Sequence, residues 1–215
     1  TSTRPIRGRL PLLLLVLSSC LPTASLRAEL KLPNIFGDHM VLQQDKPIHV
    51  WGWETAGAKI SVNWAGQTKA TTSNQDGQWS VHFDPVKASF SGRKLLITSG
   101  KQSLAFADIL VGEVWMASGQ SNMQWKVAKS SARELEVAAV GAGQVAPIRE
   151  FEITSVYAML HPIEKATGAW KNGSYTDYSA IAFAFAENLY RELNVPIGIL
   201  NCSFSQTAIQ AWVPR

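Results

Sequence analysis

The sequence has few of the residues that build disulfide frameworks, metal clusters or charged binding faces. Its 215 residues include two cysteines, Cys20 and Cys202, too few for a disulfide scaffold or a cysteine metal site. The formal net charge is only +4, and the N-terminus supplies much of it through Arg4, Arg7, Arg9 and Arg27. We therefore expect no nucleic-acid partner. No apolar run is long enough to span a bilayer.

The overall amino-acid composition is that of a globular protein. The content of hydrophobic residues is 46%, with eight tryptophans, and a chain of this length can bury one or two ordinary cores. Cys202 lies in the apolar run IGILNCS and is expected to be a small buried residue.

Residues 1–28 have the order of regions that is typical of a signal peptide. Three arginines precede an apolar stretch, LPLLLLVLSSCL, and small residues follow it before Glu29, so cleavage is expected near Ala28. A lipoprotein is the alternative, because Cys20 follows small residues at a position where a lipid anchor could be attached. Both predict a secreted, periplasmic or extracellular protein without a membrane span.

Residues 29–108 have the periodicity of short strands separated by Gly, Pro, Asn and Asp. An Asp-Gly pair in NQDGQW (74–79) is typical of a hairpin turn. We predict a β-sandwich domain of the immunoglobulin or jelly-roll type. Its tryptophans Trp51, Trp53, Trp64 and Trp79 could form a sugar-stacking platform, although core packing is the commoner use of aromatic residues on strands. The strand-like runs are HMVLQQ, IHVWGW, KISVNWAG, TKATTS, QWSVHFD, RKLLITSG and SLAFADI.

Residues 109–215 change to an alternation of strands and helices. ILVGEVWMA (109–117), IREFEIT (148–154) and VPIGILNCS (195–203) are expected strands, and the first is continuously apolar as in parallel sheets. The spacing of Met123, Val127, Leu135 and Ala139 predicts one helix, and that of Ile181, Phe185, Leu189 and Leu193 places these four residues on one face of another. This order predicts an α/β layer.

Small polar residues follow the first of these α/β strands. Ser118-Gly119-Gln120-Ser121-Asn122 lies where ligands bind in parallel sheets, at the carboxyl end of a strand and before a helix. Such a position exposes the hydroxyl of Ser121 and directs backbone N–H groups toward developing negative charge. A serine there can be a nucleophile, or Ser118 or Ser121 can simply cap the helix. The position in the sequence alone does not decide between a nucleophile and a helix cap.

Four segments in the same order resemble the sialate O-acetylesterase family of the SGNH-hydrolase superfamily. GEVWMASGQSNMQW (112–125) is similar to the family's nucleophile block. The others are LPNIFGDHMVLQQDKPIHVWGW (32–53), YSAIAFAFAENLYREL (178–193) and VPIGILNCSFSQTAIQAW (195–212). The resemblance extends from Leu30 to Trp212. It implies that residues 109–215 are the N-terminal part of an incomplete, SGNH-hydrolase-like α/β domain with flavodoxin-like three-layer architecture.

The resemblance assigns roles to individual residues. Ser121 corresponds to the nucleophile, and its own N–H to one oxyanion donor. The oxyanion and substrate pocket implied by the resemblance comprises Gly119, Gln120, Asn122, Ser205 and Gln206. The family's usual Gly-Gly falls on Ser205 and Gln206, where side chains could prevent the backbone angles that place a donor N–H.

The general base of the family has no counterpart in this sequence. That base is a histidine in an Asp-x-x-His block, whereas His39, His49 and His82 lie in the β region and His161 has no aspartate three residues before it. A serine hydroxyl is a weak nucleophile without a positioned base. We therefore expect the chain to be a fragment or a truncated reading frame.

The expected function is that of a secreted carboxylic-ester hydrolase that removes O-acetyl groups from sugars. The resemblance implies no cofactor and no metal, and an acetylated carbohydrate as partner. Sialic acids and acetylated plant or algal polysaccharides suit the chemistry equally. The alternative is a non-catalytic carbohydrate-binding protein, or a degenerate fragment without a catalytic base.

We predict that the mature protein begins near Glu29, or at a lipid-modified Cys20. N-terminal sequencing of the exported product tests this, because either start follows from removal of the basic and apolar regions. Recovery of an intact N-terminus that still contains Arg4 would contradict both.

Overall fold

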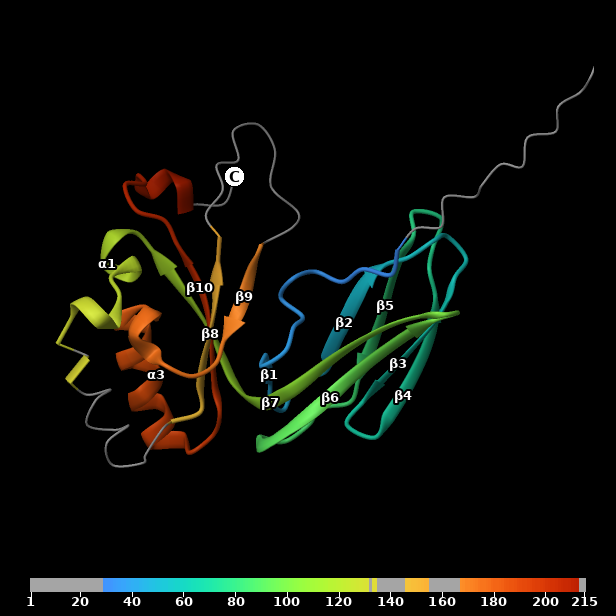
Figure 1. Ribbon diagram of the computed structural model, residues 1–215, viewed down its shortest axis with the longest axis horizontal. Helices are drawn as coiled ribbons and strands as arrows, with labels where there is room; N and C mark the ends of the chain where they lie inside the picture. The colour runs from blue at the N-terminus through green and yellow to red at the C-terminus, as the bar shows by residue number, and fades with distance from the viewer. Residues whose placement is uncertain (1–28, 132, 135–145, 155–166, 213–215) are drawn as a thin grey trace, which may run out of the picture.

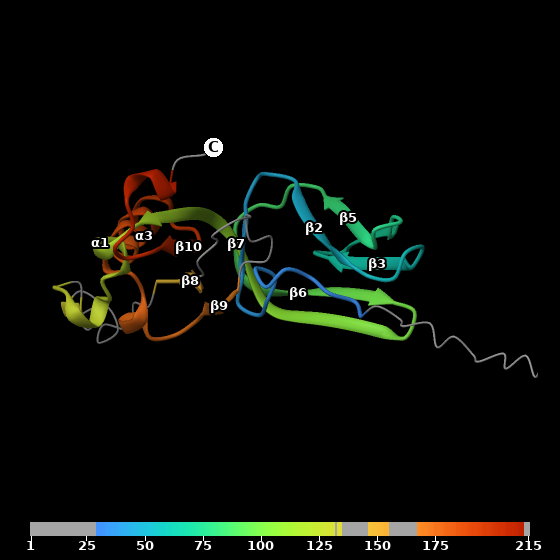
Figure 2. The same ribbon diagram turned by 90° about the horizontal axis from the view of Figure 1, so that it is seen from above.

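The computed structural model describes residues 29–131, 133–134, 146–154 and 167–212. Figure 1 shows an elongated molecule, with a β-rich part at one end, the helices at the other, and strand β7 running between them. The view from above in Figure 2 shows the same two parts side by side.

The described strands are arranged in two sheets. One has eight strands in the order β4-β3-β6-β7-β10-β8-β9, with β1 paired to β7, and β2 and β5 form the other. The strands are β1 (Val41–Gln43), β2 (Ile48–Trp53), β3 (Lys59–Trp64), β4 (Gln67–Thr72), β5 (Gln78–Phe83), β6 (Ser89–Ser99), β7 (Gln102–Gly119), β8 (Ile148–Ile153), β9 (Gly168–Lys171) and β10 (Ile197–Ser203). The helices are α1 (Ser121–Gln124) and α3 (Ala180–Leu193), with 3-10 turns η1 (Val127–Lys129), η2 (Tyr175–Asp177) and η3 (Ile209–Trp212).

Strand β7 belongs to both parts of the molecule. Its first half pairs antiparallel with β6, and residues Glu113 to Gly119 pair parallel with the whole of β10. Strand β10 then pairs parallel with β8. Every run predicted as a strand overlaps a strand, but SLAFADI and ILVGEVWMA, predicted as two, are one continuous strand, β7, and β9 was not predicted. The fold is mostly sheet, with one large mixed sheet and few helices. The proposed domain boundary at Asp108 falls inside β7, and the division into domains stays a prediction.

The buried apolar side chains form two hydrophobic clusters. The first includes Trp64 and Trp79 of the β-rich part, which are 0% and 4% exposed, and extends across the junction to Phe151 of β8 and Trp170 of β9. The second packs the inner face of α3, with Phe183 and Ala186, against Ile197 and Ile199 of β10. Alternation along the strands explains this burial, since every second side chain of a strand points to the same face.

Arg149 joins the two parts at the middle of β7. Its side chain is only 7% exposed, and it lies on β8. The guanidinium donates to the Asp108 carboxylate at 2.7 Å, to the Asp108 carbonyl and to the His39 carbonyl at 2.9 Å. Burial alone would raise the pKa of Asp108, but hydrogen bonds from His39 and Arg149 and their charges outweigh it, so the pKa lies below its ordinary value.

The helix expected after Ser121 is much shorter than predicted. Helix α1 has four residues and ends at Trp125, whose extended backbone (ψ 125°) breaks the helical path. Backbone pairing explains the break, because Lys126 forms a β-bridge with Ser179. Leu135 and Ala139 of the predicted helix lie outside the described residues.

Helix α3 forms as predicted, but the four-residue apolar spacing does not mark its buried side. Ile181, Phe185 and Leu193 are 50%, 44% and 47% exposed, while small residues and Phe183 face the sheet. Phe185 packs edge-on against Trp115 of β7, which is itself 44% exposed. Cys202 is half-buried on β10, not buried as predicted.

The segment of β7 from Glu113 to Gly119 has a strand neighbour on one side only among the described residues. Exposed Trp115 and Met116 lie on this segment. No helix in the described part of the chain is both long and apolar enough to cross a membrane.

We predict that Arg149→Ala lowers the free energy of unfolding by about 2 kcal/mol, because it removes three donated hydrogen bonds from partly buried acceptors. Urea denaturation measures the change. The control is Lys87→Ala, which breaks the exposed ion pair with Asp45 and should cost under about 1 kcal/mol. Equal costs for the two variants would show that Arg149 does not join the two parts.

Candidate active site

Ser121 lies at the carboxyl end of β7 and is the first residue of α1. Its side chain is exposed, and its hydroxyl oxygen is 3.0 Å from that of Ser205. Ser205 follows β10, the strand paired with the same end of β7, and Ser203 is in register with Gly119. Parallel pairing therefore brings together two serines that are 84 residues apart in the sequence.

Gln124 holds the Ser205 loop against α1. Its side-chain amide donates to the Ser203 carbonyl at 3.0 Å, and its carbonyl oxygen accepts from the Ser205 N–H at 2.9 Å. The sequence analysis missed this residue. Its position three residues after Ser121, one turn along the same side of a helix, is the feature that could have identified it.

The backbone on both sides of the pocket adopts angles that favour glycine. Gly119 has a φ of 149°, and a β-carbon there would lie 3.4 Å from that of Met123. Gln206 has a φ of 62°, in the left-handed region that is uncommon for residues with a side chain. The backbone thus has left-handed geometry at a position where the family resemblance expects glycine.

The remaining predicted pocket residues, Gln120 and Asn122, flank Ser121 in the sequence. Gln120 precedes α1, is exposed and provides no side-chain cap. Asn122 is exposed, and its carbonyl accepts from the N–H of Trp125. Because Ser121 is a helical residue and not its cap, helix capping does not account for its hydroxyl, and Ser118 lies on β7.

Buried polar groups lie behind the two serines on β10. Asn201 is 1% exposed and accepts from the Ser203 hydroxyl at 2.7 Å. Its side-chain nitrogen has no hydrogen-bond partner among the described residues. Polar side chains therefore line the carboxyl end of β10, where the alternating pattern of the strand would place apolar ones.

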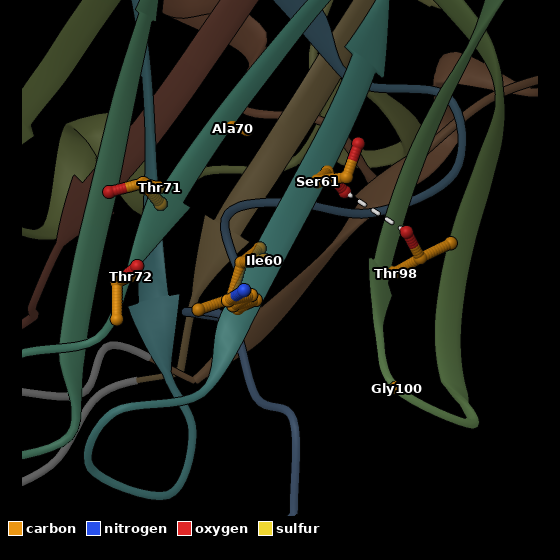
Figure 3. A pocket seen from close by; sticks show the side chains of 8 residues that line it. Ile60, Ser61, Ala70, Thr71, Thr72, Thr98 and Gly100 are labelled. Carbon is orange, nitrogen blue, oxygen red and sulfur yellow. Dashed lines mark hydrogen bonds between the residues drawn. The ribbon is translucent and has the colours of Figure 1, made fainter.

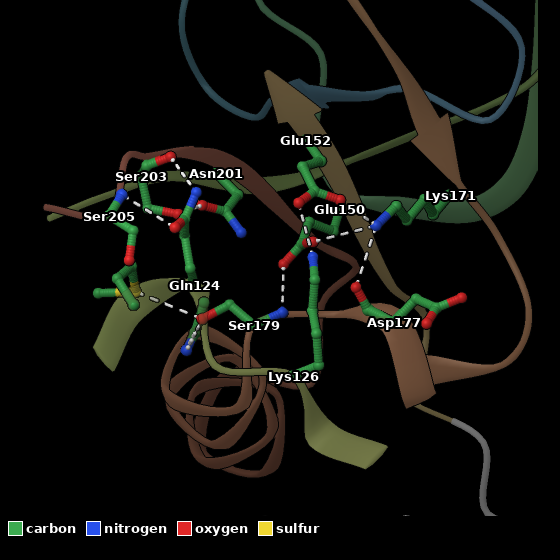
Figure 4. Close-up of polar contacts among 12 residues, drawn as sticks. Gln124, Lys126, Glu150, Glu152, Lys171, Asp177, Ser179, Asn201, Ser203 and Ser205 are labelled. Atoms are coloured by element: carbon green, nitrogen blue, oxygen red, sulfur yellow. Dashed lines mark hydrogen bonds and ion pairs between the residues drawn. The ribbon is translucent and has the colours of Figure 1, made fainter. Parts of the chain in front are cut away.

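Two glutamates of β8, Glu150 and Glu152, form an acid–base cluster with Lys126 and Lys171 (Figure 4). Glu150 is fully buried and accepts from the Ser179 N–H at 3.0 Å. Burial raises the pKa of Glu150, although the Ser179 N–H and the charges of Lys171 and Lys126 act in the opposite direction.

The other carboxylate of this cluster stays ionised. Burial would raise the pKa of Glu152, but hydrogen bonds from Lys126 and Lys171 lower it below its ordinary value. Ser179 also donates from its hydroxyl to the sulfur of Met123 at 3.4 Å. The cluster thus fixes the N-terminus of α3 against α1.

No described histidine is bonded to Ser121. His39 pairs with Asp108 at 2.7 Å, and His49 stacks on His82, while His161 lies outside the described residues. Within the part of the chain that the structure covers, no group of three or more His, Cys, Asp or Glu side chains could hold a metal ion. The arrangement offers an exposed hydroxyl and nearby backbone N–H groups.

We predict that Gln124→Ala costs about 1–2 kcal/mol of unfolding free energy and increases amide hydrogen exchange at Ser205, because the Ser205 N–H loses its acceptor. Gln120→Ala is the matched control and should change stability by less than about 0.5 kcal/mol. Unchanged protection of the Ser205 amide in Gln124→Ala would contradict this role.

Comparison with known proteins places these features in context. The chain is 30% identical over 197 residues to sialate O-acetylesterase of Rattus norvegicus and 32% identical over 198 residues to that of Homo sapiens, covering 83% of this chain in both cases. No family model matches the sequence. The crystal structure of a carbohydrate acetylesterase from Xanthomonas citri superposes with a TM-score of 0.79 at 33% identity, covering 86% of this chain.

The chain spans only part of these proteins. It covers 36% of the rat protein, 38% of the human protein and 42% of the Xanthomonas citri chain. Over the part that it does span, sequence and fold agree. The chain is a homologue of the sialate O-acetylesterases.

Proposed function

We propose that this chain supplies the nucleophile of a carboxylic-ester hydrolase that removes O-acetyl groups from sugars, and that Ser121 is that nucleophile. The position of the Ser121 hydroxyl supports the proposal: it is exposed at the carboxyl end of a strand in a parallel pair, 3.0 Å from a second hydroxyl. Ligands bind at such strand ends in α/β sheets. The homologues named as acetylesterases support the reaction class.

The finer fold assignment is part of the same proposal. We propose a β-sandwich in residues 29–108 and the first part of an SGNH-hydrolase-like α/β layer in residues 109–215. The parallel order β7-β10-β8, with α3 packed on it, supports the second assignment.

The reaction would follow the two steps of serine acyl transfer. The oxygen of Ser121 attacks the acetyl carbonyl carbon, a general base takes the serine proton, and the sugar hydroxyl leaves with a proton. Water then attacks the acetyl-serine, which releases acetate and restores the hydroxyl. We propose that the base lies outside the residues described, and that the Ser121 N–H is one donor to the oxyanion.

Ser205 has a direct effect on this chemistry. Either hydroxyl of the Ser121–Ser205 pair can be the donor. If the Ser121 hydroxyl donates this hydrogen bond to Ser205, its proton points away from a base. If the Ser205 hydroxyl donates, it occupies one lone pair of the Ser121 oxygen. Ser205 therefore competes either with the base for the Ser121 proton or with the ester carbon for the Ser121 lone pair. During attack, its hydroxyl must rotate away from Ser121 or donate its hydrogen bond to another acceptor.

In the full gene product, Ser121→Ala should lower the rate of acetyl-ester hydrolysis by about 10⁴-fold or more, because it removes the attacking oxygen. Hydrolysis of a chromogenic acetyl ester measures the loss, and thermal denaturation verifies folding. Ser118→Ala is the matched control, since it removes an exposed hydroxyl of the same stretch, and it should retain activity. Full activity in Ser121→Ala would overturn the assignment.

A second prediction concerns the departure from the family's Gly-Gly. In the full gene product, Ser205→Gly should raise turnover by freeing the Ser121 hydroxyl. Gln206→Gly should stabilise the fold by up to about 1 kcal/mol, because its φ of 62° suits glycine. Steady-state kinetics and urea denaturation separate the two effects. Lower turnover in a folded Ser205→Gly would show instead that the Ser205 hydroxyl assists the reaction.

We further propose that the protein is exported. The order of basic, apolar and small residues in residues 1–28 supports this, and an acetylated polysaccharide would be met outside the cytoplasm.

A further inference from the structure

The outer face of the two-stranded sheet β2–β5 has an unusual set of side chains. Strand β2 alternates, with Ile48, Val50 and Gly52 buried and His49, Trp51 and Trp53 turned outward. The register places Trp51 opposite Ser80 and Trp53 opposite Gln78. Two indoles therefore stand side by side on one strand and face hydroxyl and amide groups on the next.

These side chains line a shallow hollow of about 510 Å³. Thr71 and Thr72, at the end of β4, and Asn74 form its other wall. The full lining is His49, Trp51, Gly52, Trp53, Thr71, Thr72, Asn74, Gln78, Trp79 and Ser80. Strands β2 and β5 lie in the β-rich part of the molecule, at the other end from α1, the helix that begins with Ser121 (Figure 1).

Among the residues that the structure describes, no Asp, Glu, Lys or Arg side chain lines the hollow. His49 adds no full charge at neutral pH, because burial, together with the neighbouring His82, lowers its pKa. A charged ligand would find no counter-ion there. Flat aromatic rings beside neutral hydroxyl and amide groups instead match a molecule with apolar C–H faces and a rim of hydroxyl groups.

We propose that this hollow binds a neutral oligosaccharide. Trp53 and Trp51 would contact the C–H faces of successive sugar rings, and Gln78, Ser80 and the two threonines would bond to sugar hydroxyls. Trp64 and Trp79 belong to the core, so only two of the four tryptophans considered from the sequence serve in such a platform. The site is separate from the Ser121 site and does not depend on the proposed reaction.

Packing within the protein explains the position of Trp51 without a ligand. Trp51 contacts Phe36 edge-on, with ring centroids 4.9 Å apart, and stacks on His49 at the same distance. Trp53 is half-buried and lies opposite Gln78. Trp53→Ala leaves the contacts of Trp51 with Phe36 and His49 in place, so it tests ligand binding without removing that packing.

A neighbouring hollow provides an internal control. It has a volume of about 370 Å³ and shares Thr71 and Thr72, but most of the rest of its wall comes from β3 and from the end of β6, including Ser61 and Thr98 (Figure 3). It has no aromatic side chain and includes Lys59. A change there alters the surface near the proposed site without removing the stacking platform.

Isothermal titration calorimetry of the 215-residue chain tests the proposal with unacetylated β-1,4-linked hexasaccharides of glucose and of xylose. Neither can be hydrolysed as an acetyl ester, so the result is independent of Ser121. At least one should bind saturably, and N-acetylneuraminic acid, which is anionic, should bind more weakly. Trp53→Ala should weaken binding by about tenfold or more, and Gln78→Ala by about threefold.

Ser61→Ala, in the neighbouring hollow, and Trp115→Ala, an exposed tryptophan far from it, should bind like the unaltered chain, as should Ser121→Ala. Failure of both hexasaccharides to bind at millimolar concentration would overturn the proposal. So would unchanged binding in a folded Trp53→Ala, or a loss confined to Ser121→Ala, which would place the sugar at the other site. Should Trp53→Ala not fold, the exposed Gln78→Ala decides.

Discussion

The backbone ladder of β7 is the constraint on which the rest of the structure depends. One strand of 18 residues pairs antiparallel with β6 in its first half and parallel with β10 in its second. Because side chains alternate along a strand, a register shift by one residue would exchange buried and exposed faces in both parts at once. Arg149 secures the middle of β7 through the Asp108 carboxylate and two backbone carbonyls.

The candidate site follows from this ladder. Ser203 is in register with Gly119, so the residues after each strand end emerge together, and Gln124 then joins the two loops through both atoms of its amide. The buried Glu150 and its neighbouring lysines place the N-terminus of α3 against the same edge. Strand pairing sets the position of Ser121, and side-chain hydrogen bonds fix its surroundings.

Much of the fold could be predicted from the sequence, because strand alternation is a local property. Alternating apolar residues predicted the strands that contain Trp64 and Trp79, and helical spacing predicted helix α3. The length of α1 could not be predicted, since the break at Trp125 depends on a bridge between Lys126 and Ser179, a contact between distant segments. For the same reason, the exposed side of α3 differs from the apolar spacing: tertiary contacts and not periodicity decide which face is buried.

The site could be predicted in part. A serine after an apolar strand and before a helical turn is a local pattern that drew attention to Ser118 and Ser121, but the family resemblance was needed to choose Ser121 as the candidate nucleophile. The resemblance placed Ser205 in the pocket, but its contact with Ser121 and its hydrogen bond to Gln124 depend on the parallel pairing of β7 with β10, which no local pattern encodes. The left-handed backbone at Gln206 was also outside local prediction, because side-chain preferences there would disfavour it.

The most direct test of the central claim is to trap the acyl intermediate. The full gene product is mixed with an excess of an activated acetyl ester, quenched in acid and digested, and the acetylated peptide is sequenced by mass spectrometry. The account predicts one acetyl group on Ser121. An acetyl group on Ser205 or Ser118, with Ser121 unmodified during turnover, would contradict it.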